Sequence, residues 1–136
     1  MEVDYDRTSQ QMLDALGCRQ YVTDDAAARI PQRRKGKQKV VFEFFKLGYP
    51  ITDEEVEHER VMRNITIDVY AQCAVIENDK PFADAHTNSV SWKNAEGGWH
   101  YLIYLRDKFG HCVIVDRGLN QCYGWAGGVR EYLDVA

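Results

Sequence analysis

Residues 97–118 read GGWHYLIYLRDKFGHCVIVDRG and form the most apolar stretch of the chain. Two runs rich in aromatic and β-branched residues, 99–105 and 109–115, flank a short charged break. This arrangement predicts a β-hairpin. The hairpin also carries three side chains of chemical interest: His100, His111 and Cys112. We therefore expect any chemistry of the chain to involve this hairpin.

The composition predicts one globular domain over residues 1–136, since 45% of the residues are hydrophobic and 28% are charged. A net charge of −4 argues against general nucleic-acid binding, which needs a clustered positive field. The four cysteines are irregularly spaced and no signal peptide precedes them, which predicts a reduced, cytoplasmic protein. No apolar run approaches the ~20 residues of a membrane span, so none is expected.

Helices are predicted in the first half of the chain. Thr8 or Ser9 can cap the first of them, and Thr52 with Glu55 forms a capping box for the last. Between them, a three-to-four spacing of apolar residues favours a helix over a strand at 39–47. The expected helices cover about 8–16, 24–30, 39–47 and 52–63.

The second half is predicted to be mainly strands. Apolar and polar residues alternate over 65–75, which is typical of a half-buried strand, and 82–92 is predicted to be another. With the hairpin these give an antiparallel meander of about four strands, extended by a short strand at 119–125 and a terminal helix at 129–133. The expected fold is therefore α+β, with amino-terminal helices (about 8–64) packed on a carboxy-terminal meander (about 65–125).

One basic cluster and two tryptophans are candidate binding residues. Five cations fall within seven positions around Gly36, and such a cluster can contact an acidic partner or phosphate. Trp and Arg side chains are also frequent in protein interfaces, although core packing is the alternative for the tryptophans and a solvated loop for the cations. The candidates are Arg33, Arg34, Lys35, Lys37, Lys39, Trp92 and Trp125.

Cysteine and histidine could also support thiol catalysis. A cysteine nucleophile needs a base, a group that orients the base, and donors for the oxyanion. Cys18 followed by His111 resembles the chain order of papain-like hydrolases. No closely spaced pair of Cys or His ligands is present, so neither a metal site nor a cofactor is predicted.

The stretch from Trp99 to Leu105, followed by His111, resembles the H-box strand of LRAT-like and NlpC-related acyltransferase families, which includes the picornavirus 2A H-box/NC proteins. Asn120-Gln121-Cys122 is the nearest match to their Asn-Cys motif, but it has an intervening glutamine, and it lies closer to His100 than in those families. The resemblance implies His100 as base, His111 as its partner and Cys122 as nucleophile.

Because no catalytic set is complete, we expect binding rather than catalysis. The sequence is interpreted as a small viral- or phage-type accessory protein that binds a host or viral macromolecule, in the host cytoplasm if it is viral. A protein partner is favoured over nucleic acid at 33–39. The alternative is a thiol-dependent hydrolase or acyltransferase that uses a Cys/His pair.

Overall fold

The computed structural model describes residues 1–23, 25–48, 51–118 and 124–133. Within these residues the sheet has seven strands, accompanied by four α-helices and one 3₁₀ turn. The strands are β1 (Glu2–Asp4), β2 (Arg19–Val22), β3 (Lys37–Lys46), β4 (Asn88–Lys93), β5 (Trp99–Asp107), β6 (Gly110–Arg117) and β7 (Trp125–Leu133). The helices are α1 (Ser9–Asp14), η1 (Ala26–Arg29), α2 (Asp53–Arg63), α3 (Val69–Asn78) and α4 (Lys80–Ala85).

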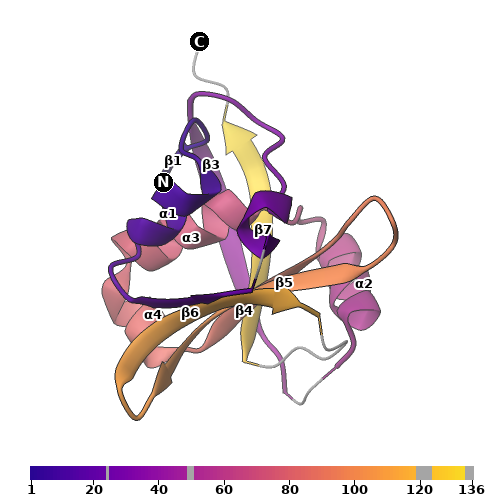
Figure 1. Cartoon of the computed structure of the whole chain (residues 1–136). Helices are drawn as coiled ribbons and strands as arrows, with labels where there is room; N and C mark the ends of the chain where they lie inside the picture. Colours follow the sequence, from indigo (N-terminus) through magenta and orange to yellow (C-terminus); the bar gives the residue numbers. More distant parts are fainter. Residues whose placement is uncertain (24, 49–50, 119–123, 134–136) are drawn as a thin grey trace.

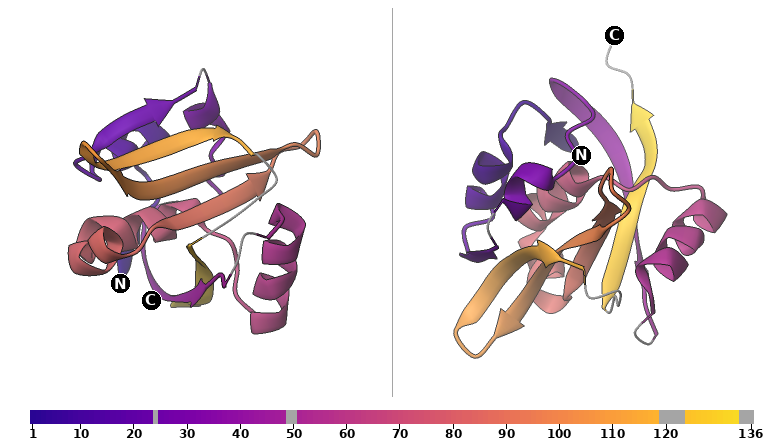
Figure 2. Two further views of the ribbon diagram at one scale, coloured as in Figure 1. Left: turned by 90° about the horizontal axis from the view of Figure 1, so that it is seen from below. Right: turned by 45° about the vertical axis from the view of Figure 1, so that its right-hand side comes forward.

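The sheet is mixed and bent into two halves. Its strand order is β1-β3-β7-β4-β5-β6-β2, and only the parallel pair Asn88 to Trp125 connects β4 with β7. In Figure 1 the half containing β3 and β7 runs across the half containing β4, β5 and β6. The helices α1, α3 and α4 fill the angle between the halves, whereas α2 lies beside β7 on the other side (Figures 1 and 2).

The predicted arrangement of amino-terminal helices on a carboxy-terminal meander is wrong. Strands account for 41% of the structure and helices for 30%, and the strands are spread along the chain. The two segments nearest the termini, β1 and β7, lie in the same half of the sheet and both flank β3. Long-range pairing therefore assembles the sheet from both ends of the sequence.

The alternating segment at 65–75 is largely the helix α3, not a strand. Asp68 caps this helix, because its Oδ1 accepts a hydrogen bond from the Ala71 amide at 2.9 Å. Nearly every side chain from Val69 to Ile76 is buried, including polar Gln72. A helix that is buried on all sides has no clear polar face. The alternation of apolar and polar residues over 65–75 therefore does not distinguish a strand from a helix here.

The segments predicted as helices at 39–47 and 129–133 are strands that pair with each other. β3 and β7 form a long antiparallel ladder with a bulge between Val41 and Phe42. β-Branched and aromatic residues fill β3, as suits a half-buried sheet surface. The segment 82–92 is divided between α4 and β4.

The central hairpin and both capping predictions are confirmed. β5 and β6 pair over their whole length, and the capping boxes begin α1 at Thr8 and α2 at Thr52. Of the helix predicted at 24–30, the described residues 25–30 contain only the short 3₁₀ helix η1, and the strand predicted at 119–125 lies mostly outside the described residues. No helix in the described part of the chain is long and apolar enough to cross a membrane.

Candidate functional site

The basic cluster divides into cations that face acidic neighbours and cations that do not. Strand pairing places Lys39 directly across from Glu2 and Lys37 directly across from Asp4. Opposite charges at such positions stabilise an antiparallel pair. Lys37 and Lys39 therefore have a structural explanation, which leaves Arg33, Arg34 and Lys35 as candidates for binding.

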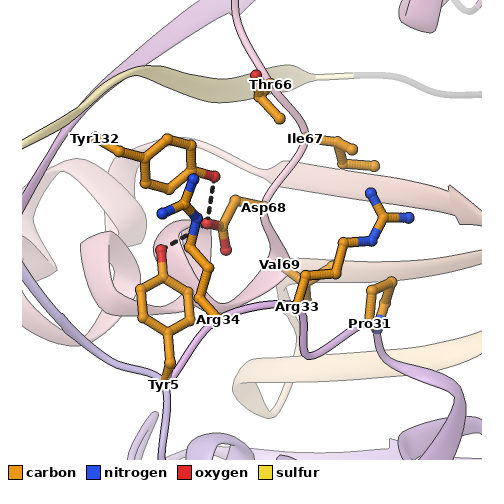
Figure 3. A pocket seen from close by; sticks show the side chains of 9 residues that line it. All are labelled: Tyr5, Pro31, Arg33, Arg34, Thr66, Ile67, Asp68, Val69 and Tyr132. Carbon is orange, nitrogen blue, oxygen red and sulfur yellow. Dashed lines mark hydrogen bonds between the residues drawn. The ribbon is translucent and has the colours of Figure 1, made fainter. Parts of the chain in front are cut away.

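Arg33 and Arg34 line a pocket of about 370 Å³ between the 31–34 segment, the start of α3 and the end of β7. Figure 3 shows the Arg34 guanidinium over the ring of Tyr132, while the Arg33 guanidinium extends away from the tyrosines, towards Ile67. The pocket combines this charge with apolar walls. Its lining residues are Tyr5, Pro31, Arg33, Arg34, Thr66, Ile67, Asp68, Val69 and Tyr132.

Asp68 organises the floor of this pocket. The hydroxyls of Tyr5 and Tyr132 both donate to its Oδ2, at 2.6 Å and 2.8 Å, while its Oδ1 caps α3 (Figure 3). Three donors thus converge on one carboxylate from three segments far apart in the sequence. Asp68 therefore joins the residue that follows β1, the start of α3 and the end of β7.

The environment of the two phenols keeps them protonated. Burial raises the pKa of Tyr5, and its hydrogen bond to Asp68 and the charge of that carboxylate raise it further. Burial and the same carboxylate also raise the pKa of Tyr132. Both tyrosines therefore act as hydrogen-bond donors near neutral pH, and neither is suited to act as a base.

The segment that carries the arginines is fixed before any ligand binds. Gln32 donates to the carbonyl oxygen of Tyr5 at 2.6 Å, and the Gly36 amide donates to Asp6 Oδ1 at 2.8 Å. The Arg34 guanidinium carbon lies 3.3 Å from the ring centre of Tyr132, and its Nη1 donates to Gln38. This wall of the pocket is therefore ordered by several independent contacts, which lowers the entropy cost of binding.

Arg33 differs from Arg34 in having no such anchor. It is exposed, and it makes no ion pair or hydrogen bond with any described residue. A planar guanidinium presents five donors and pairs well with carboxylates. The pocket therefore offers an uncommitted cation at its rim and apolar surface within.

The two histidines of the central hairpin lie at its opposite ends. His100 pairs with Arg117, whereas His111 pairs with Arg106 at the other end of the ladder. His111 stacks on Tyr104 at 5.4 Å, and its Nε2 lies 3.6 Å from Asp84 Oδ1. The structure therefore does not bring His100 and His111 together.

His100 is buried and held in one tautomer. Asn94 Oδ1 accepts hydrogen bonds from the amides of Glu96 and Gly98, both at 2.9 Å, so Asn94 Nδ2 must face His100 Nε2 at 3.0 Å. Nε2 is then an acceptor, and the proton of the neutral ring is on Nδ1. Burial, followed by the charges of Arg29 and Arg117, lowers the pKa of His100.

This neutral histidine makes the fold sensitive to acid. The pKa of His100 is lower in the folded chain than the usual value of about 6.5 for an unfolded one, so the unfolded state binds more protons as the pH falls. We expect His100 to stabilise the fold above that pH and to lose this contribution below it. The measurement is the free energy of unfolding from about pH 7.5 to about pH 5.5 in the wild type and in His100→Gln.

The matched control for this prediction is Gly48→Ala, an exposed substitution that changes no titratable group. The difference in the free energy of unfolding between wild type and His100→Gln should shrink towards acid pH, whereas the difference for Gly48→Ala should stay nearly constant. Parallel pH profiles for the wild type and His100→Gln would contradict the inferred protonation state.

The described cysteines lack the surroundings of an activated thiol. Burial raises the pKa values of Cys18, Cys73 and Cys112. The Cys112 thiol lies 3.9 Å from an oxygen of Asp107, which also raises its pKa, and within the described residues no thiol makes a hydrogen bond with an imidazole. Cys122, with its neighbours 119–123, lies outside the described residues.

The two candidate tryptophans differ in location. Trp92 is only 2% exposed and stacks on His100 at 5.9 Å, so it belongs to the core. Trp125 is half-buried, and its ring contacts those of Phe82 and His86. Of the two, only Trp125 has surface that a partner could reach.

Sequence reasoning missed the tyrosines and the aspartate of the pocket. Tyr5, Asp68 and Tyr132 are each about 63 residues from the next, and no local pattern connects them. The one local signal is Asp68, whose position before an apolar run suits a helix cap.

No family model matches the chain, and no curated protein or solved structure is significantly similar to it. The resemblance to H-box/NC proteins therefore stays a prediction.

Proposed function

We propose that the protein is a binding protein, and that the pocket beside Arg33 and Arg34 receives an acidic side chain or carboxyl group of a protein partner. The observation that supports this most directly is Arg33. It lies at the rim of a pocket of about 370 Å³, next to an ordered wall, without an ionic partner among the described residues. Binding a carboxylate would supply that partner.

The rest of the pocket supports an acidic group attached to a larger molecule. Pro31, Ile67 and Val69 provide apolar surface for the carbon skeleton next to the charge. Asp68 does not oppose an incoming anion as a free carboxylate would, since two phenols and one backbone amide already donate to it. The overall net charge of −4 favours protein over nucleic acid as the partner.

Charge reversal at Arg33 tests the proposal. The probe is a short fluorescent oligoglutamate peptide, titrated with the full chain at low salt and followed by fluorescence anisotropy. Arg33→Glu should weaken binding at least about tenfold, because each 1.4 kcal/mol changes affinity by that factor. Its circular dichroism should be unchanged, since the exposed Arg33 side chain makes no ion pair or hydrogen bond with the described residues.

Lys35→Glu is the matched control, because Lys35 is exposed and close in sequence but does not line the pocket. It should weaken binding far less than Arg33→Glu, and an oligoglutamine peptide should not bind. Equal losses in both variants would indicate a diffuse surface field and refute a pocket. An oligonucleotide of equal charge that binds more tightly than the peptide would show nucleic acid to be the preferred partner.

A further inference from the structure

A second pocket, of about 270 Å³, lies at the turn between β4 and β5, on the sheet face that η1 covers. Strand register creates its floor. Trp92, His100 and Arg117 are consecutive partners across β4, β5 and β6, so their side chains form one row on one face of the sheet. Arg29, at the end of η1, lies on the other side of this pocket.

Two guanidinium groups line the pocket, and neither has a strong ionic partner among the described residues. The Arg117 guanidinium has no ion pair within the described part of the chain. Arg29 pairs with Asp25 at 3.3 Å, but both side chains are exposed, and such a pair contributes little and rearranges easily. The two cations are close enough to His100 that both lower its pKa.

Asn94 and His100 also line this pocket. One hydrogen of Asn94 Nδ2 is used by His100, which leaves the second hydrogen for a ligand. His100 is 4% exposed, and its Nδ1 has no hydrogen-bond partner among the described residues. Because Asn94 Oδ1 accepts from two backbone amides, the Asn94 side-chain donor is fixed in place.

Carboxylates near the pocket set limits on its charge. Asp116 accepts hydrogen bonds from the Thr23 hydroxyl and from the Arg117 amide, and Asp25 pairs with Arg29. Glu96 lines the pocket itself, in the exposed turn, where solvent screens its charge. An anion that binds here therefore needs enough charge to compete with these groups.

We propose that this pocket binds the phosphate group of a small phosphorylated molecule, held between Arg29 and Arg117 and hydrogen-bonded by Asn94. A dianionic phosphate balances two guanidinium groups, whereas a carboxylate would leave one of them uncompensated. Arginine forks also match the oxygen geometry of a phosphate. Trp99 lines the edge of the pocket, where its indole nitrogen donates to Glu54 Oε1 at 2.9 Å and the Lys93 ammonium lies over its ring.

The test is a titration of the full chain, followed by NMR at the His100 ring and the Asn94 side-chain amide. The probes are inorganic phosphate, glycerol phosphate and, as a carboxylate, acetate. Arg117→Gln should weaken phosphate binding about tenfold, which corresponds to about 1.4 kcal/mol. Bound phosphate should also raise the pKa of His100 towards its usual value, because an anion favours the charged ring.

Two further variants make the test specific to this pocket. Arg106→Gln removes another exposed arginine, from the far end of the same hairpin, and should leave binding unchanged. Glu96→Gln should tighten binding, since it removes the carboxylate at the rim. Tighter binding of glycerol phosphate than of phosphate would identify an ester as the ligand, and the reverse would identify the free ion.

The proposal is overturned if Arg117→Gln and Arg106→Gln weaken binding equally, if acetate binds as tightly as phosphate, or if saturating phosphate leaves both NMR signals unmoved. Circular dichroism of each variant establishes that it is folded. Because Arg33 is not part of this pocket, the result is independent of the peptide experiment.

Discussion

Replacing Asp68 with alanine is expected to lower the free energy of unfolding by about 3 kcal/mol, the sum of three losses of about 1 kcal/mol each. The first loss is the cap of α3, because Asp68 Oδ1 accepts from the Ala71 amide. The other two are the hydrogen bonds from Tyr5 and Tyr132. Tyr5 is 2% exposed, so its hydroxyl would lose its partner where water has little access.

Asp79→Ala is the matched control for this measurement. Asp79 caps α4 through the Phe82 amide, but it is exposed, and no phenol donates to it. Its replacement should cost about 1 kcal/mol in urea unfolding at neutral pH. Equal losses at the two positions would show that the tyrosine hydrogen bonds do not contribute to stability.

A double-mutant cycle with Tyr5→Phe separates the share of one phenol. In the wild type this substitution removes a hydrogen bond to a charged acceptor, so it should destabilise the fold. In the Asp68→Ala background the hydroxyl has already lost that acceptor, and the same substitution should cost nothing or stabilise. Additive effects in the cycle would contradict the convergence of the phenols on Asp68.

The parts of the fold that the sequence predicts correctly are those that depend on nearby residues. The capping boxes at Thr8 and Thr52 each lie within four residues, and the β5–β6 hairpin closes through a short turn. The predictions are wrong where packing against residues far away in the sequence determines the conformation. α3 is buried on nearly every side, and β3 is a strand because β7, over 80 residues later, pairs with it.

The candidate site likewise combines features that nearby residues determine with features that distant residues determine. Arg33 and Arg34 are visible in the sequence as part of a charge cluster, but the cluster alone does not show which cations are free. Pairing of β1 with β3 places Lys37 and Lys39 opposite acidic residues, and register is a tertiary property. The same holds for His100, whose neighbour Arg117 is set by the hairpin register.

Gly128 in β7 packs directly against Thr66, which lines the pocket beside Arg33 and Arg34. Gly128→Ala is therefore the second substitution with a large expected effect. A Cβ at Gly128 would lie 2.7 Å from the carbonyl oxygen of Thr66, which is backbone and cannot rotate away. Thr66 exchanges two hydrogen bonds with Val129, at 2.7 Å and 2.8 Å, and these hold the start of α3 against the sheet. We expect a loss of about 3 kcal/mol, at the upper end of the usual overpacking cost.

The control is Gly48→Ala, since a Cβ at Gly48 meets no heavy atom within 4 Å and its backbone is not in the left-handed region. It should change the free energy of unfolding by less than about 0.5 kcal/mol. Gly128→Ala should also weaken oligoglutamate binding in the fraction that stays folded, because Thr66 and Asp68 both line the pocket. If Gly128→Ala is as stable as Gly48→Ala, the 65–68 segment does not lie as closely on β7 as the structure places it. That result would also contradict the pocket, because Thr66, Ile67 and Asp68 of this segment line it.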